Sequence, residues 1–263
     1  MHRALRTLIV SCAVAASLAA ASAFAGSFDV TVYGSVVDPQ RGFDYMRVIP
    51  GRVVIARMDH ALLAGAFANG DYSTEYAIDD TATLVEIDTA TGAVSPIGEL
   101  AGLEDAAHIG LAIDPTTSEA YVLVAWSPCT DTNLYGVDLV TGATMLIGGV
   151  PGCMQSPVFA PDGTLYALDR DTDYLVSLTN GLVEIGSVGF PLDDADVLTY
   201  PPGYDVLFLW AFNPIVETNM LYSVDVGTGS ATLIGEVGGQ DPIAAMAVGG
   251  PLPDSVFANG FDP

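Results

Sequence analysis

The sequence contains no lysine, and its seven arginines stand against 32 acidic residues, which gives a formal net charge of −25 at pH 7. A surface with so few cationic groups repels phosphate, so nucleic acids and anionic membranes do not fit as partners. The same negative field favours calcium ions or cationic partners. It also keeps an exported protein soluble, which is the simplest reading of the charge.

Familiar catalytic motifs are absent as well. The chain has no Gly-x-Ser-x-Gly elbow, no His-Glu-x-x-His pair and no phosphate-binding glycine loop. Only two histidines, His60 and His108, follow residue 25, which excludes a histidine-rich metal centre. The sequence therefore names no catalytic residue and does not favour an enzyme.

Long apolar runs are confined to the N-terminus. A positively charged head is followed by an uncharged run from Leu8 to Ala20 and by a small-x-small site at Ala23-Phe24-Ala25. This is the pattern of a secretory signal peptide, and the run is shorter than the roughly 20 apolar residues that span a bilayer. We predict that residues 1–25 are removed and that the protein is periplasmic, cell-surface or extracellular. A lipoprotein signal ending at Cys12 is a weaker alternative.

Cysteine is scarce: beyond residue 25 the chain has only Cys129 and Cys153. An even pair in an oxidising compartment indicates a disulfide. We therefore predict that these two residues pair.

A repeated segment is the strongest positive feature of the chain. Each copy has a strand that begins with leucine, a turn closed by glycine, and a second strand that ends in Ile-Gly. A spacing of about 40–50 residues between copies is typical of propeller blades. The four copies are Leu84–Gly98, Leu134–Gly148, Leu175–Gly186 and Leu221–Gly235.

The turn chemistry predicts that each copy is a β-hairpin. Asp88, Asp138 and Asp225 stand where a side-chain carboxylate can accept hydrogen bonds from turn N–H groups. The glycines at 92, 142, 181 and 229 can take the left-handed conformation that closes a short loop.

Two further strands precede each hairpin, which makes four strands per unit. At the ends of the chain, one C-terminal strand and three N-terminal strands complete a fifth unit, so that the ring has no open sheet edge. We predict an all-β fold, a single β-propeller of five four-stranded blades closed by the two ends, with four or six blades as the alternatives. The expected domains are a signal peptide at 1–25, the propeller at 26–250 and a C-terminal tail at 251–263.

The units, written Leu-Tyr-x-Val-Asp-x-x-Thr-Gly-x-x-x-x-Ile-Gly, resemble those of exported bacterial propeller proteins of unassigned function. More distantly they are similar to NHL-type and quinoprotein-type propellers. The resemblance covers about residues 60–250 and implies a fold but no activity, because propellers host lyases, lactonases, adhesins and scaffolds. The tryptophan-docking pattern of quinoproteins is missing, since Trp126 and Trp210 are the only tryptophans, so pyrroloquinoline quinone is not expected.

The last ten residues, Asp254–Pro263, resemble a short (I/V)FxxGF(E/D) tail found on many exported proteins of Gram-negative bacteria. Residues 249–253 read as a linker to it. The resemblance implies a sorting or secretion signal. The alternative is a terminus whose two phenylalanines tuck back onto the barrel.

Candidate ligands of a propeller axis lie in the loops that lead into the innermost strands, which we call the leading loops. Four of the five leading loops carry an aspartate at a comparable place, and aspartates that converge on an axis suit calcium, which takes six to eight oxygen ligands. The predicted metal ligands are Asp59, Asp105, Asp194 and Asp241. With His60 and His108, the same loops could instead build a zinc-like or hydrolytic site. The simpler alternative is that these aspartates bind no ion, cap turns and face water. The leading loops are 58–60, 104–108, 153–155, 193–196 and 240–242.

Two other features are interpreted as structural. The alternating aspartates of Asp169–Asp173 lack the glycine and distant glutamate of an EF-hand, so a solvated hairpin turn is expected there. The strand aromatics are expected to pack between blades rather than to form a sugar platform. They are Tyr121, Tyr135, Tyr166, Tyr222 and Trp210.

Together these features favour an exported, monomeric, non-enzymatic binding module whose partner is a protein, a glycan or a small molecule. A structural Ca²⁺ on the axis is compatible with this function. The alternative is a metal-dependent hydrolase or lyase, lactonase-like, that uses an axial Asp/His set.

Overall fold

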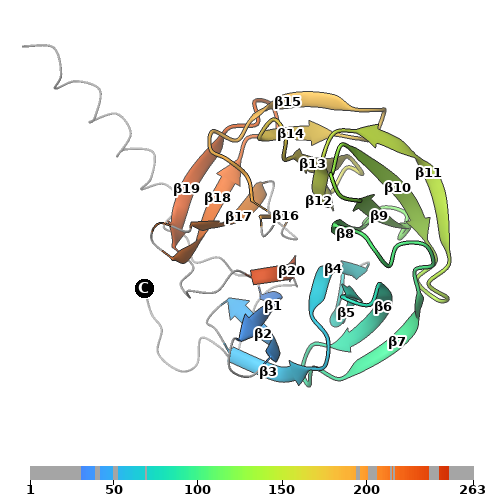
Figure 1. Ribbon diagram of the computed structural model, residues 1–263. Helices are drawn as coiled ribbons and strands as arrows, with labels where there is room; N and C mark the ends of the chain where they lie inside the picture. Colours follow the sequence, from blue (N-terminus) through green and yellow to red (C-terminus); the bar gives the residue numbers. More distant parts are fainter. Residues whose placement is uncertain are drawn as a thin grey trace, which may run out of the picture.

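The computed structural model describes residues 31–38, 42–49, 53–68, 70–193, 196–200, 206–213, 215, 217–236 and 243–248. These residues form twenty strands in five four-stranded antiparallel sheets. The sheets surround one axis as the blades of a β-propeller (Figure 1). The five-bladed all-β prediction is confirmed, and the four- and six-bladed alternatives are excluded.

The blades are numbered here in chain order. Blade 1 is β4 (Leu62–Ala68), β5 (Asp71–Asp79), β6 (Thr83–Asp88) and β7 (Val94–Glu99). Blade 2 is β8 (His108–Ile113), β9 (Ala120–Ala125), β10 (Asp131–Val137) and β11 (Thr144–Pro151). Blade 3 is β12 (Met154–Phe159), β13 (Leu165–Asp169), β14 (Tyr174–Ser177) and β15 (Val183–Ser187). Blade 4 is β16 (Val197–Thr199), β17 (Leu207–Asn213), β18 (Thr218–Val224) and β19 (Ala231–Glu236).

Blade 5 joins the two ends of the propeller. It contains β20 (Ile243–Val248), β1 (Val32–Asp38), β2 (Gly42–Ile49) and β3 (Val53–Met58), in the order β20-β1-β2-β3. β1 pairs antiparallel with β20, with Val32 opposite Val248 and Val36 opposite Ile243. β20 lies beside the axis with β4, β8, β12 and β16, while β3 and the fourth strand of every other blade lie on the perimeter (Figure 1). The predicted closure between the chain ends is therefore confirmed.

Five clusters of the hydrophobic core lie one at each interface between neighbouring blades, and a sixth, small cluster contains Ala125 and the two cysteines of the disulfide. The second strand of a blade supplies two clusters at once, because successive side chains of a strand point to opposite faces. On β9, Val122 and Val124 pack toward blade 1, and Leu123 packs toward blade 3. On β17, Leu209 packs toward blade 3 and Trp210 toward blade 5. This is why β9 and β17 are apolar on both faces.

The Ile-Gly ending of each repeat is a β-bulge in the outer hairpin. In blade 1, Leu84 lies opposite Gly98 and Val85 opposite Pro96, so Ile97 is the extra residue. The same register shift leaves the corresponding isoleucine unpaired in all the other blades: Ile55, Ile147, Ile185 and Ile234. A bulge bends its strand and adds twist. The repeat motif therefore marks where the outer hairpin curves over the next blade.

The glycines of the motif allow neighbouring blades to meet closely. A Cβ placed on Gly98 would overlap the carbonyl oxygen of Thr141 in the turn of blade 2, and one on Gly186 would overlap that of Thr228 in the turn of blade 4. In blade 5 the same position is Ala56, whose Cβ lies against Gly92 of blade 1. Nothing lies within 4 Å of a Cβ placed on Gly148 or on Gly235. Gly148 faces the shorter β14–β15 hairpin of blade 3, and residues 50–52, between β2 and β3 of blade 5, lie outside the described residues.

The turns are built as the sequence predicts. Asp88 Oδ1 accepts hydrogen bonds from the backbone N–H groups of Ala90 and Thr91 at 3.0 and 2.8 Å. Gly92 closes the turn with a φ of 69° and donates its N–H to the Asp88 carbonyl at 2.7 Å. The turns at Asp138 and Asp225 repeat this arrangement. The predicted signal peptide at 1–25 and tail at 251–263 lie outside the described residues.

Candidate functional site

The predicted axial aspartates are only partly described. Asp59 and Asp105 are exposed residues of the leading loops before β4 and β8, and neither lines the axial cavities described below. Asp194 and Asp241 lie outside the described residues. A calcium site formed by these four carboxylates therefore stays a prediction.

The two histidines of the leading loops have different surroundings. His60 Nδ1 lies 2.9 Å from Asp80 Oδ1, in the turn between β5 and β6. His108 begins β8, is partly buried and lines a cavity on the axis. The structure thus places only one of them at the axis.

That cavity lies at the N-terminal ends of the innermost strands, and we call it the N-terminal cavity. Its volume is about 270 Å³, which is room for about nine water molecules. Among the described residues, four blades contribute to it, through the beginnings of β4, β8, β12 and β16. Its polar side chains are His108, Gln155, Ser156 and Asp196, and Leu63, Ile109 and Leu198 are among its apolar ones.

Asp196 is the buried acid of this cavity, with only 3% of its surface exposed. Its Oδ2 accepts a hydrogen bond from the Asp193 N–H at 2.8 Å, whereas its Oδ1 is buried without a hydrogen-bond partner in the described structure. Burial raises the pKa of Asp196 to about 7, against the opposing effects of the Asp193 and Phe212 N–H groups and of the Arg170 charge. A buried acceptor without a partner is costly, so this oxygen is a candidate contact for a ligand.

Gln155 lines the same cavity and bears a second buried acceptor. Its Nε2 donates to the Asp193 carbonyl at 2.8 Å, and this bond turns Oε1 away from that carbonyl. Oε1 is likewise buried without a hydrogen-bond partner in the described structure. Next to it, Ser156 Oγ accepts the Leu198 N–H at 2.6 Å and so ties β12 to β16. The leading residues of two blades are thereby held in fixed positions around the cavity.

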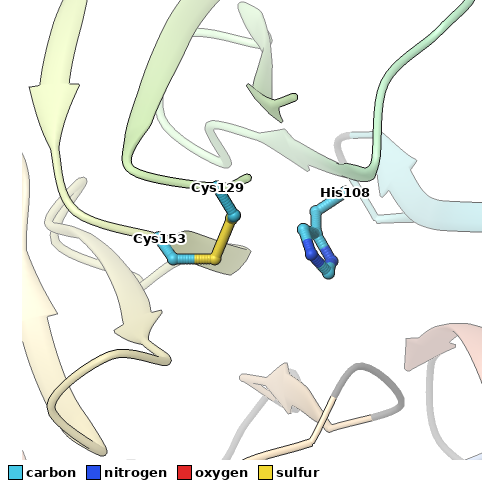
Figure 2. A group of neighbouring side chains, drawn as sticks. All are labelled: His108, Cys129 and Cys153. Carbon is cyan, nitrogen blue, oxygen red and sulfur yellow. A yellow bond between two sulfur atoms is a disulfide. The ribbon is translucent and has the colours of Figure 1, made fainter. Parts of the chain in front are cut away.

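A disulfide lies beside His108 (Figure 2). Cys129, in the loop after β9, and Cys153, just before β12, are joined with their Cα atoms 5.1 Å apart, as the sequence predicts. One ligand atom from each cysteine and from His108 lie within 4.8 Å of one another. Because each sulfur is bonded to the other, neither is a thiolate that could bind a metal. Arg170 Nη1 also lies 3.4 Å from His108 Nε2.

A second cavity, the C-terminal cavity, occupies the other end of the innermost strands. It measures about 280 Å³ and is lined largely by apolar and aromatic residues, among them Phe67, Tyr72, Phe159 and Tyr200. No buried side-chain polar atom without a partner is found among its described lining residues. Its chemistry is therefore less specific than that of the N-terminal cavity.

Two further predictions, for the Asp169–Asp173 segment and for the strand aromatics, concern described residues. Asp169 accepts hydrogen bonds from the Asp171 N–H and the Thr172 hydroxyl, so the Asp169–Asp173 segment is the expected hairpin turn. The strand aromatics pack between blades as expected, with Tyr121 against Phe159 and Tyr222 against Phe190.

The sequence predicts the leading loops but does not single out Asp196 and Gln155. The sequence gives no sign of which of Asp193, Asp194 and Asp196 is buried. Gln155 follows a cysteine and a methionine with no motif around it. Only the convergence of strands from four blades makes these two side chains neighbours.

Comparison with known proteins shows the fold and no family. No family model and no curated protein matches the chain. Among solved structures, a chain of TolB from Acinetobacter baumannii aligns with a TM-score of 0.54 at 12% identity, over 86% of this chain and 68% of that one. A chain of a nidogen/laminin complex aligns with a TM-score of 0.53 at 9% identity, over 85% of this chain and 99% of that one.

An enzyme is also among the similar structures. The pyrroloquinoline-quinone-bound aldose sugar dehydrogenase of Streptomyces coelicolor aligns with a TM-score of 0.50 at 16% identity, over 69% of each chain. At these identities the likeness concerns the propeller fold alone. Among the described residues there is also no helix of the length and apolarity needed to cross a membrane.

Proposed function

We propose that the protein is an exported binding module, not an enzyme, and that its ligand occupies the N-terminal cavity. The observation that carries the proposal is that two residues lining this cavity, Asp196 and Gln155, each bear a buried side-chain oxygen without a hydrogen-bond partner in the described structure. A ligand that donates hydrogen bonds to them offsets the cost of their burial. Pockets on an axis with a few convergent polar groups are typical binding sites.

The described lining supports binding better than hydrolysis. It combines one carboxylate and one imidazole, and the Arg170 guanidinium approaches that imidazole. A catalytic zinc site uses three protein ligands and an open position, which exceeds what these described side chains bring together. The propeller in the nidogen/laminin structure belongs to a complex, which is consistent with a binding role for such folds.

Export is part of the proposal. The Cys129–Cys153 disulfide fits an oxidising compartment, and residues 1–25 have the pattern of a signal peptide. Sequencing the N-terminus of protein recovered outside the cytoplasm should give a start at Gly26. A start at Met1 in that fraction would contradict cleavage.

The binding function is tested by blocking the cavity. Ala107 is an exposed residue at its rim, so Ala107→Trp places a bulky ring at the mouth without cutting into the core. A thermal-shift screen with small amines, polyols, sugars and amino acids should give compounds that raise the Tm of the wild type and not of this variant.

Val140→Trp is the matched control, because Val140 is 84% exposed on the turn of blade 2, away from the axis. Compounds that act on the wild type should act equally on it. If no compound stabilises the wild type, or if every stabilising compound acts equally on Ala107→Trp, the cavity is not the binding site.

The axial calcium ion is proposed separately, on Asp59, Asp105, Asp194 and Asp241. Carboxylates from four leading loops supply oxygen ligands of the kind that calcium prefers. Adding calcium at about 1 mM after EDTA treatment should then raise the Tm by several degrees, and Asp59→Asn should reduce that rise. Equal melting curves with EDTA, calcium, zinc and magnesium would contradict the proposed calcium site.

A further inference from the structure

The unpartnered side-chain atoms of the residues that line the N-terminal cavity are buried acceptors rather than donors. Asp196 Oδ1 and Gln155 Oε1 are both oxygens, and the residues that bear them are 97% and 94% buried. The amide of Gln155 cannot be reversed without placing Oε1 against the Asp193 carbonyl, because that carbonyl accepts from Nε2. The cavity therefore calls for a group that donates several hydrogen bonds.

The charge of the cavity favours a cation. Asp196 is the only acid among the described lining residues, and its carboxylate loses its hydration on burial. The chain has a net charge of −25, so its field attracts cations toward the propeller. Arg170 is the nearby cation. Its charge acts on Asp196, and its Nη1 lies 3.4 Å from His108 Nε2.

A primary ammonium matches these groups better than a bare metal ion. It has three N–H donors and one positive charge, so it can serve Asp196 Oδ1, Gln155 Oε1 and the second lone pair of Ser156 Oγ. Calcium takes six to eight oxygens, and the described lining offers few side-chain oxygens. Leu63, Ile109 and Leu198 can contact an alkyl chain that is attached to the ammonium.

We propose that the N-terminal cavity recognises small ligands through a primary ammonium group, held by Asp196 and Gln155 with the alkyl part against the apolar side chains of the cavity. This inference rests on the proposed binding function and adds the class of ligand. The ammonium lies between blades 3 and 4, whose leading residues Gln155 and Asp196 are already connected through Asp193.

The test compares butylamine with 1-butanol. The two probes are nearly equal in size, and butylamine carries its charge at pH 7.5 as a lysine side chain does. Butylamine should raise the Tm of the wild type saturably, by about 3 °C or more at saturation, and 1-butanol should not. Titration calorimetry at pH 7.5 then measures the affinity of the protein for butylamine.

Three variants decide the outcome. Asp196→Asn should weaken butylamine binding at least tenfold. Gln155→Leu should also weaken it, which keeps the test valid if Asp196→Asn does not fold. Glu184→Gln, which removes an exposed acid from the perimeter strand β15, is the charge-matched control and should bind as the wild type does.

Equal effects of butylamine and 1-butanol, or undiminished butylamine binding to both cavity variants, would overturn the ammonium proposal. If other compounds still lose their effect in Ala107→Trp in that case, the binding function stands and only the ligand class fails. If calcium alone binds and needs Asp196, the cavity is a metal site and the ammonium proposal is wrong.

Discussion

At the scale of the residue, the buried pair of Tyr45 and Glu75 makes stability depend on pH. The Tyr45 hydroxyl of blade 5 donates to Glu75 Oε2 of blade 1 at 2.6 Å, and Glu75 is fully buried. Burial raises the pKa of Glu75 to about 8, with the hydrogen bond from Tyr45 opposing it. The folded protein therefore prefers protonated Glu75, while the unfolded chain ionises near pH 4.5. Stability from this group is present below pH 4.5 and is lost as the pH rises to 8.

Glu75→Gln should remove this loss, because the amide oxygen still accepts from Tyr45 and carries no charge. Chemical denaturation at pH 5 and pH 8 should show the variant gaining a few kcal/mol on the wild type across that interval, at about 1.4 kcal/mol per pKa unit. Glu119→Gln is the matched control, since Glu119 accepts from Tyr121 at 2.7 Å but is exposed. The same pH profile for wild type and Glu75→Gln would contradict the assignment.

Also at this scale, the sequence predicts what a local turn requires and misses what a distant neighbour determines. The roles of Asp88 and Gly92 follow from a few adjacent residues, and the structure confirms them. Asp196 and Gln155 are 41 positions apart and become neighbours only through the ring. Their burial depends on blades that no local pattern describes. The disulfide is predicted because an even pair leaves one possible partner for each cysteine.

At the scale of the element, the Ile-Gly bulge and the Thr-Gly turn form one contact between blades, and this can be tested at Gly186. A Cβ there meets the carbonyl oxygen of Thr228, which belongs to a backbone turn and cannot move aside easily. Gly186→Ala should therefore lower the free energy of unfolding by about 1–3 kcal/mol, as overpacking does, measured by urea denaturation. Gly148→Ala is the control at the same place in blade 2, where nothing lies within 4 Å, and it should be near neutral. Equal losses in both variants would mean that the glycines serve strand conformation rather than contact between blades.

This contact also explains which repeat is hardest to recognise. The motif in blade 5 reads Ile55-Ala56 in place of Ile-Gly, and Tyr45 replaces the leucine that pairs with it. The methyl group of Ala56 is tolerated because it faces Gly92. The bulge register of blade 5 is the same as in the other blades although its letters differ. The sequence therefore identifies four units by similarity and the fifth only by the need to close the ring.

At the scale of the whole molecule, closure by β20 decides whether the propeller is a ring. β20 is the only partner of the inner edge of β1, and it places Val248 at the C-terminal cavity. A chain that ends at residue 242 lacks this strand, so β1 has an open edge and blades 4 and 1 lose the element that lies between them at the axis. We expect it to aggregate, or to melt in a broad transition at least 10 °C below the wild type. A chain that ends at residue 250 keeps β20 and should melt as the wild type does. Size-exclusion chromatography and calorimetry of the two truncations distinguish a ring that must close from a stack of blades that is stable when open, because only the open stack would survive the loss of residues 243–263.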